Sequence, residues 1–210
     1  MDSQLAEAAV AFQARTGATP AQMADLEAFR EELVAANAVM NLVGPDSLPD
    51  FWNRHVYDSA QLLEHEPDAL TWADLGAGAG FPGLVLAILL KGRPGAHVWL
   101  IDSLGKRCRF LEIVVANLDL PATVINGRAE TQSLAVDVVT ARALAPLETL
   151  LGYAQPYIKR GAKGLFLKGE KAEVELAAAR QTWRVDAALS VSRSDPRGRL
   201  VEVRSLRRVP

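Results

Sequence analysis

The stretch Asp74-Leu75-Gly76-Ala77-Gly78-Ala79-Gly80-Phe81-Pro82-Gly83 decides the fold of this 210-residue chain. An apolar run, Leu70–Leu75, precedes the glycines, and a second apolar run, Gly83–Leu90, follows them. Four glycines in ten residues let the backbone turn tightly and approach a ligand closely. The stretch therefore predicts a strand, a ligand-binding glycine loop and the amino terminus of a helix, in that order.

The spacing of the glycines fits two kinds of cofactor loop. Gly78, Gly80 and Gly83 match the dinucleotide fingerprint G-x-G-x-x-G. Read from Asp74 through Gly76, Gly78 and Gly80, the same stretch resembles the first motif of class I S-adenosylmethionine methyltransferases, D-x-G-x-G-x-G. A carboxylate at Asp74 would repel a pyrophosphate but attract the ammonium group of S-adenosyl-L-methionine. We therefore predict S-adenosyl-L-methionine as the cofactor, with a nicotinamide cofactor as the minor alternative.

Asp102 is the second acidic residue expected at this site. It ends the predicted strand His97–Asp102, where a carboxylate can accept hydrogen bonds from both hydroxyls of a ribose. The alternative interpretation is that Asp102 caps the helix that follows the strand.

From residue 70 onward, short apolar runs alternate with helical patterns. Strands are expected at Leu70–Leu75, His97–Asp102, Ala122–Asn126, Asp137–Ala141 and Gly164–Lys168. Helices are expected at Gly83–Leu90, Lys106–Leu118, Pro146–Lys159 and Glu170–Trp183. Two further strands, Leu189–Ser192 and Arg199–Leu206, are joined through Asp195-Pro196-Arg197-Gly198. The pattern predicts an α/β, Rossmann-like fold whose seven-stranded, mostly parallel sheet ends in an antiparallel C-terminal hairpin.

The first 66 residues show helical periodicity instead. Ser3–Arg15 is amphipathic, Thr19 and Pro20 are typical of an N-cap and a first turn, and Ser47 is expected to cap a third helix that extends to about Glu64. We therefore predict an N-terminal helical extension over residues 1–66 and a cofactor-binding methyltransferase domain over residues 67–210.

Composition excludes several classes of protein. A single cysteine and three histidines exclude a disulfide framework and a Cys/His zinc module, and no metal site is expected. The longest apolar run, Phe81–Leu90, is half the length of about 20 residues that a membrane helix needs. The N-terminus lacks the pattern of a signal peptide. These features predict a cytoplasmic protein without a membrane partner. No feature requires a protein partner, so we expect a monomer.

The charge is divided unevenly along the chain. Residues 1–75 carry 13 acidic and 3 basic side chains, whereas residues 151–210 carry 6 acidic and 13 basic ones. Such a division is typical of a protein that binds a polyanion on its basic side, although charged edge strands are also found for solubility alone.

The residues around the predicted site limit the methyl acceptor. The fourth strand ends in Thr140-Ala141-Arg142-Ala143-Leu144, without the Asp/Asn-Pro-Pro-aromatic motif of enzymes that methylate exocyclic amines. No cysteine nucleophile lies there for attack on cytosine, and the first lysine of the chain is Lys91, so the N-terminal lysine of ribose 2′-O enzymes is missing. An acceptor that needs no deprotonation, such as guanine N7, is consistent with this elimination.

An ordered set of short motifs resembles the RsmG (GidB) family. It comprises Asn41-Leu42-Val43, Trp52, Arg54-His55, Asp58-Ser59, the glycine loop, Ile101-Asp102-Ser103, Lys106-Arg107, Gly127-Arg128-Ala129-Glu130, Ala141-Arg142-Ala143 and Lys168-Gly169. The resemblance covers roughly residues 37 to 170. It implies methyl transfer from S-adenosyl-L-methionine to N7 of guanine 527 in bacterial 16S rRNA, within the small ribosomal subunit.

The resemblance also implies particular cofactor contacts, at Gly76, Phe81, Ala129, Glu130 and Arg142. Arg142 is the expected catalytic residue, acting by position and charge because no general base is needed. It would hold a phosphate, the guanine O6 edge or the cofactor carboxylate. The alternative is a salt bridge from Arg142 to Glu148 or Glu130.

Basic residues near the expected sheet edge are candidates for contacts with RNA. These candidates are Arg54, His55, Lys106, Arg107 and Lys168. His55 would hydrogen-bond to RNA or close over the cofactor; alternatively it packs its helix on the sheet, with Arg54 and Asp58 as a surface ion pair. Other functions left open are a methyltransferase for another RNA or a small molecule, and a non-catalytic RNA-binding protein.

Overall fold

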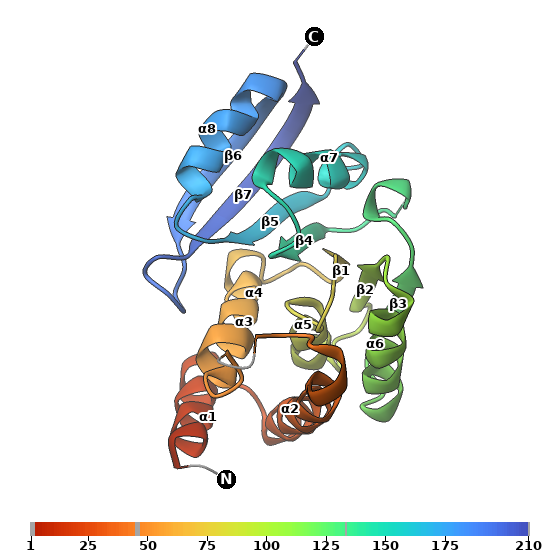
Figure 1. Cartoon of the computed structure of the whole chain (residues 1–210), viewed down its shortest axis with the longest axis vertical. Coiled ribbons are helices and arrows are strands. Elements are labelled where there is room, and N and C mark those ends of the chain that lie inside the picture. The colour runs from red at the N-terminus through yellow and green to blue at the C-terminus, as the bar shows by residue number, and fades with distance from the viewer. Residues whose placement is uncertain (1–2, 45–46, 133, 210) are drawn as a thin grey trace.

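The structure, a computed structural model, describes residues 3–44, 47–132 and 134–209. The expected extension, residues 1–66, therefore lies within the described part except for residues 1–2 and 45–46. The helical elements before the sheet are α1 (Ser3–Thr16), α2 (Pro20–Met40), the π-helical segment η2 (Phe51–Tyr57), α3 (Asp58–Ala60) and α4 (Leu62–His65). In Figure 1, α1 and α2 lie at the end of the molecule where the N-terminus lies, and α3 and α4 extend from there toward the middle.

Seven strands form one sheet, in the order β3-β2-β1-β4-β5-β7-β6. The strands are β1 (Thr71–Leu75), β2 (His97–Asp102), β3 (Ala122–Asn126), β4 (Val138–Arg142), β5 (Lys163–Lys168), β6 (Trp183–Val191) and β7 (Arg199–Arg208). The helices and helical turns between them are α5 (Gly83–Leu90), α6 (Gly105–Asn117), η3 (Ala129–Thr131), α7 (Leu147–Ile158) and α8 (Ala172–Thr182). Strands β1 to β5 are parallel, and the β6–β7 hairpin pairs antiparallel to β5, as the sequence predicted.

Two hydrophobic cores cover the two faces of the sheet. One core joins buried side chains of α2, η2, α5 and α6 to the sheet, and the other joins those of α7 and α8. Helix α5 is buried at seven of its eight positions, which explains why its sequence is apolar all round. None of the described helices is long and apolar enough to cross a lipid bilayer.

Helix α2 begins as its sequence predicts. Thr19 Oγ1 accepts a hydrogen bond from the Gln22 backbone N–H (3.2 Å), and the Gln22 side chain accepts one from the Thr19 N–H (2.9 Å). This reciprocal capping box, with Pro20 at the first helical position, satisfies N–H groups that the helix leaves free.

Two elements begin several residues from the expected position, and other limits differ by one or two residues. The third helix begins at Phe51, not at Ser47, because the Ser47 hydroxyl donates to the Gly44 carbonyl (2.7 Å) and leaves the helix uncapped by a side chain. Strand β6 begins at Trp183, where we expected helix. Its inward positions include Ala187, a weak strand former, so its alternation is faint until β7 pairs with it.

An aromatic cluster joins the N-terminal helices to the glycine loop. The ring of Phe29 lies 6.1 Å from that of Phe51 and 5.3 Å from that of Phe81, between centroids, and Phe29 is fully buried. Helix α2, segment η2 and the glycine loop therefore pack together through these rings, so the N-terminal helices stabilise the position of the loop.

Replacing Phe29 by Ala tests this support. We expect the free energy of unfolding to fall by about 3–5 kcal/mol, because the substitution leaves a cavity between three elements. Urea titration measures it, with Val39→Ala as the control: Val39 is 80% exposed on the same helix and should change stability by less than about 0.5 kcal/mol. Equal effects of the two substitutions would contradict the packing role.

Candidate functional site

The glycine loop follows β1 at the carboxyl edge of the parallel strands. The backbone N–H groups of Gly76 and Ala77 both donate to the carbonyl of Ile101 (2.8 and 3.0 Å), which ties the loop to β2. Gly80 has φ +95°, and a Cβ added there would lie 2.3 Å from Leu84 Cδ1. Glycine is therefore required for the turn into α5, as the sequence predicted.

Asp74 is placed behind the loop and not in a cavity. Its side chain is fully buried, and Oδ2 accepts a hydrogen bond from the Gly83 backbone N–H (2.8 Å) at the start of α5. Its Oδ1 is buried without a hydrogen-bond partner among the described residues. Burial raises the pKa of Asp74 to about 7, against the opposing effects of the Gly83 hydrogen bond and Arg142. The expected direct contact of Asp74 with a cofactor ammonium group is thus replaced, in this conformation, by a role in holding the loop.

Asp102 also holds the loop, but at the wall of a cavity. Its Oδ2 accepts from the Gly78 N–H (3.0 Å) and its Oδ1 from the Leu104 N–H (2.8 Å), while Arg107 Nη1 lies 3.7 Å from Oδ2. The bond to Leu104 is a local turn before α6; the N-cap residue of α6 is Leu104, without a side-chain cap, so the capping role given above as the alternative for Asp102 is not observed. Asp102 nevertheless lines a cavity of about 300 Å³, here called the side cavity, together with Gly76, Ala129 and Glu130. Four predicted cofactor residues from distant parts of the sequence therefore meet there.

A larger cavity of about 870 Å³, here called the main cavity, adjoins the side cavity. Gly76, Arg107 and Ala143 line both cavities. The walls of the main cavity come from the glycine loop, residues 42–44, side chains of η2, the ends of β4 and β5, and residues 194–198 of the β6–β7 loop. Its volume lies within the usual range of a small-molecule site.

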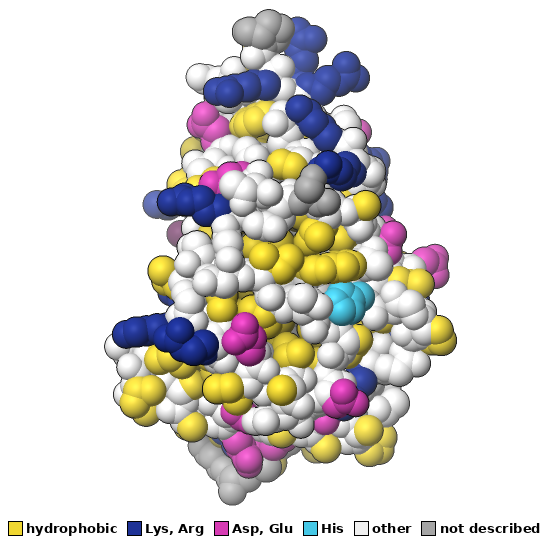
Figure 2. All heavy atoms as spheres, turned by 90° about the vertical axis from the view of Figure 1, so that its right-hand side faces the viewer, with side chains coloured by type: hydrophobic (Ala, Val, Ile, Leu, Met, Phe, Trp, Pro, Cys, Tyr) yellow, Lys and Arg dark blue, Asp and Glu magenta, His cyan; other side chains and the backbone are white. Residues whose placement is uncertain are grey.

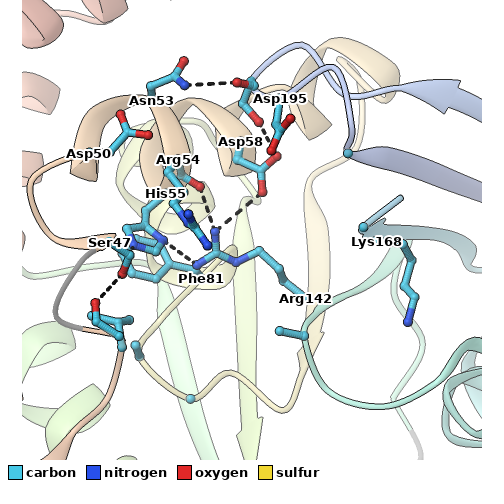
Figure 3. Close-up of a pocket in the computed structure, with 18 of the residues that line it drawn as sticks. Ser47, Asp50, Asn53, Arg54, His55, Asp58, Phe81, Arg142, Lys168 and Asp195 are labelled. Atoms are coloured by element: carbon cyan, nitrogen blue, oxygen red, sulfur yellow. Dashed lines mark hydrogen bonds and ion pairs between the residues drawn. The ribbon is translucent and has the colours of Figure 1, made fainter. Parts of the chain in front are cut away.

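Arg142 ends β4 and is held by groups of η2, α3 and the loop (Figure 3). Its Nη1 donates to the Arg54 carbonyl (3.0 Å) and lies 3.5 Å from Asp58 Oδ2, and its Nη2 lies 2.8 Å from His55 Nδ1. The guanidinium also stands 4.8 Å from the centroid of the Phe81 ring. The expected alternative, a salt bridge to Glu148 or Glu130, is wrong: the carboxylate partner of Arg142 is Asp58. The surface pair Arg54–Asp58 is likewise not formed, because Asp58 faces Arg142.

His55 is a buried positioning residue. It is 4% exposed, its ring stacks on Phe81 (4.7 Å between centroids), and Nε2 lies 3.0 Å from Ser47 Oγ. A guanidinium can only donate, so Nδ1 accepts from Arg142 and the proton lies on Nε2, which donates to Ser47. Burial, then the positive charges of Arg142 and Arg54, lower the pKa of His55 to about 3. Both ring nitrogens are engaged within the chain, which agrees with the alternative that His55 packs its helix on the sheet; a contact of His55 with RNA stays a prediction.

The β6–β7 loop is a wall of the main cavity that sequence reasoning missed. Ser194 Oγ donates to Asp58 Oδ1 (2.6 Å), and the Asn53 side-chain amide donates to the Ser194 carbonyl (3.0 Å). Asp58 therefore bonds the loop with one oxygen and pairs with Arg142 through the other. The sequence held a partial signal, since Asp58-Ser59 belongs to the motif set, but nothing local connects residue 58 to residue 194.

The basic candidates divide into two groups. Arg54, Arg107 and Lys168 line the main cavity, whereas Lys106 does not. Lys168 Nζ is held by Glu175 (2.7 Å) and the Ala145 carbonyl (2.9 Å), and no ion pair to a described carboxylate involves Arg54. Arg54 is thus the better placed of these cations for an anionic ligand. Phe81 lines the main cavity as expected, as does Gly78, while Gly80 serves the turn.

The raised pKa of Asp74 predicts a pH effect on stability. An unfolded Asp ionises near 3.8 but the folded one near 7, so the folded state loses stability relative to the unfolded state as the pH rises between these values. In the Asp74→Asn variant the amide oxygen still accepts a hydrogen bond from Gly83. Between pH 5 and pH 7 its free energy of unfolding, relative to that of the wild type, should rise by about 1 kcal/mol per pH unit. Urea unfolding at several pH values measures the difference. A difference independent of pH would contradict the buried, proton-bearing carboxyl.

The tautomer of His55 can be observed directly. Long-range ¹H–¹⁵N spectra should show Nε2 protonated and Nδ1 unprotonated throughout pH 5–8, because the pKa lies near 3. In the Arg142→Ala variant, Nδ1 loses its donor and the ring should begin to titrate at higher pH. A His55 ring that titrates near pH 6.5 in the wild type would overturn this arrangement. Since an unfolded histidine ionises at about 6.5, the folded state should also lose stability as pH falls below that value.

Comparisons with known proteins agree with this geometry. The family model GidB, described as rRNA small subunit methyltransferase G, matches residues 22–197. Ribosomal RNA small subunit methyltransferase G of Caulobacter vibrioides strain NA1000 is 57% identical over 201 residues, which cover 96% of this chain and 93% of that protein. The protein of the same name from Bradyrhizobium strain BTAi1 is 45% identical and is matched over 84% of this chain and 81% of its own length.

Solved structures share the fold at low identity. A SAM-dependent methyltransferase from Aquifex aeolicus superimposes with a TM-score of 0.56 at 17% identity, covering 80% of this chain and 97% of that one. An O-methyltransferase from Bacillus cereus in complex with SAH gives a TM-score of 0.57 at 16% identity, covering 84% and 90%. The fold is therefore the Rossmann-like fold of these methyltransferases, and the resemblance found in the sequence is confirmed. By the match of the family model and the identity to its relatives, this chain belongs to the GidB family of rRNA small subunit methyltransferases.

Proposed function

We propose that this protein transfers the methyl group of S-adenosyl-L-methionine to N7 of guanine 527 of 16S rRNA in the small ribosomal subunit. The observation that carries the proposal is Arg142, a cation held rigidly on the wall of the main cavity beside the glycine loop, in a chain of this family. The specific base comes from the family resemblance. We also propose that the chain acts in the cytoplasm and as a monomer.

The described residues fit this cofactor in three ways. The side cavity offers apolar side chains, Leu104, Leu144 and Tyr153 among them, for an adenine ring, with Ala129 and Glu130 beside them. The carboxylate of Asp102 lies at the wall of the same cavity, where it would meet a ribose diol. The backbone at Gly76 lines both cavities, so the cofactor would pass over it from one to the other.

Arg142 retains hydrogen-bonding capacity for a ligand. A guanidinium has five N–H groups. Three of them are directed at the Arg54 carbonyl, Asp58 and His55. The two that remain would hold an anionic or carbonyl oxygen, either the cofactor carboxylate or the O6 edge of guanine. Because the other three contacts fix the plane of the guanidinium, binding costs little further side-chain entropy.

The bound cofactor supplies an electrophilic methyl group on a sulfonium. The N7 lone pair of guanine attacks without prior loss of a proton, so the chain needs no general base there. The residues agree with that requirement, because His55 has a pKa near 3 and both its nitrogens are engaged. The work of the chain is then to hold guanine in line with the methyl group and to exclude water.

The electrostatics of the main cavity suit the product. Methylation at N7 would leave a positive charge on the guanine ring. Carboxylates of Asp50, Asp58 and Asp195 line the main cavity and would stabilise a cationic 7-methylguanine. Arg54 and Arg107 line the same cavity and would bind the flanking phosphates.

Arg142→Ala tests the role of Arg142. We expect turnover on small ribosomal subunits to fall at least tenfold, about 1.4 kcal/mol in activation free energy, with the fold retained. Arg142→Lys should recover little, because an ammonium cannot keep three divergent partners. Arg93→Ala, which removes an exposed arginine bonded to the Pro67 carbonyl, is the matched control and should turn over normally. Normal turnover of Arg142→Ala at saturating cofactor would contradict the proposed role.

The reaction itself is tested with labelled S-adenosyl-L-methionine and small subunits that lack the modification. Free 16S rRNA, bulk tRNA and a blank without RNA run in parallel, and borohydride–aniline cleavage maps N7-methylguanine. A single cut at guanine 527 is expected. A cut elsewhere would assign another RNA site, and cofactor binding without label in any RNA would indicate a small-molecule acceptor or a non-catalytic role.

A further inference from the structure

Six basic side chains gather at the end of the molecule that carries the C-terminus. Figure 2 shows Lys and Arg side chains concentrated at that end, with few Asp or Glu among them. They come from the two residues after α7, the last turn of α8 and the paired ends of β6 and β7, and all are exposed. Arg184 and Arg207 project from one face of the hairpin and Arg208, opposite the buried Trp183, from the other, so the six surround this end of the sheet. We call them the distal basic face; its members are Lys159, Arg160, Arg180, Arg184, Arg207 and Arg208.

The distal basic face differs from the other cations of the C-terminal third. Most of those have a carboxylate partner, as Lys163 has in Glu66, Lys168 in Glu175 and Arg199 in Glu173. None of the six members forms an ion pair with a carboxylate of the described residues. Ion pairs within the chain therefore neutralise most of the other cations of the C-terminal third but none of the six at the distal end, among the described residues.

The register of the hairpin makes the concentration of charge costly. Arg184 lies directly opposite Arg207 in the antiparallel pair, so both side chains project from the same face. Like charges placed directly opposite each other destabilise a sheet. Asp186, two residues along β6 on that face and opposite Ser205, is the nearest acidic position in the strand. Stability of the free chain does not explain this arrangement, whereas a polyanionic partner would.

The hairpin connects the distal basic face to the main cavity. Strand β7 runs from Arg199, next to the cavity-lining Gly198, to Arg208. Ten residues of strand span roughly 30 Å, at about 3.3 Å each. A single nucleotide bound in the main cavity is too short to reach the distal basic face. A folded RNA that places one nucleotide in the cavity is long enough to contact it.

We propose that the distal basic face binds the phosphate backbone of the substrate RNA, at a segment remote from the methylated base. This inference rests on the proposed function, and it adds an anchoring site outside the catalytic cavity. Five of the six members are arginines, whose planar guanidinium groups pair with phosphate oxygens through two hydrogen bonds. The contacts are electrostatic and independent of sequence, so they supply affinity and orientation while the cavity selects the base.

The double variant Arg184→Glu/Arg207→Glu tests the anchor. The variant keeps two like charges at the same cross-strand positions, so the repulsion between the two strands is similar in the variant and in the wild type. We expect KM for small subunits to rise at least tenfold with kcat unchanged. Binding to 16S rRNA should become less sensitive to salt: the slope of log K against log salt concentration should decrease in magnitude by about two, one for each lost phosphate contact. Asp186→Ser, which removes the acid from this face, should tighten binding instead.

Two controls separate the anchor from a general defect. A short RNA that contains only the target loop cannot span to the distal basic face, so any methylation or binding measured with it should be equal for the double variant and the wild type. Arg93→Glu, a charge reversal elsewhere, should behave as the wild type with every RNA. If Arg184→Glu/Arg207→Glu folds poorly, Arg184→Ser/Arg207→Ser replaces it, with a smaller rise in KM expected.

The outcomes also separate this inference from the proposed function. No methylation of subunits by the wild type would overturn the proposed function. Methylation by the wild type with the same KM and salt dependence in the double variant would overturn the anchor alone. Weaker binding of the variant to subunits but not to free 16S rRNA would overturn RNA as the partner and indicate a ribosomal protein.

Discussion

The guanidinium of Arg142 is the point at which three separate parts of the chain are joined. Arg142 itself ends β4. Its partners are His55 and the Arg54 carbonyl of η2 and Asp58 of α3, which in turn bonds the β6–β7 loop. A planar cation with five donors can satisfy several acceptors at once in a way that no other side chain can. The main cavity has a defined shape because these elements converge on one group.

The acidic residues of the glycine loop stabilise the loop through backbone N–H groups. Asp74 accepts from Gly83, and Asp102 accepts from Gly78 and Leu104. Glycine-rich backbone is costly to order, and buried carboxylates that accept from it offset part of that cost. Asp102 remains at a cavity wall and combines this structural task with ligand binding, whereas Asp74 is fully enclosed.

Much of the fold could be predicted because its signals are local. The limits of β2, β3 and α5 agree with expectation, since each is an apolar run bounded by glycine, proline or polar residues. Predictions failed where partners are distant in sequence. The alternation of β6 is weak until β7 pairs with it, and the carboxylate partner of Arg142 lies 84 residues away at Asp58, not at the nearby Glu148 or Glu130. The burial of His55 was one of two alternatives that the sequence left open, because Phe81 and Arg142, which enclose it, come from other elements.

The sharing of Asp58 between Arg142 and Ser194 has a thermodynamic consequence. One oxygen of its carboxylate bonds the hairpin loop and the other pairs with Arg142, so a ligand that moves the loop changes the environment of the guanidinium. Under the proposed function, guanine of the RNA would lie near Asp195 of this loop, and the cofactor carboxylate is one of the two groups that Arg142 would hold. Coupling between two binding sites is reciprocal, so if RNA binding strengthens the hold on the cofactor by some factor, the cofactor strengthens the hold on RNA by the same factor. Under the proposed function, a single aspartate would thus make the affinities for the two substrates interdependent.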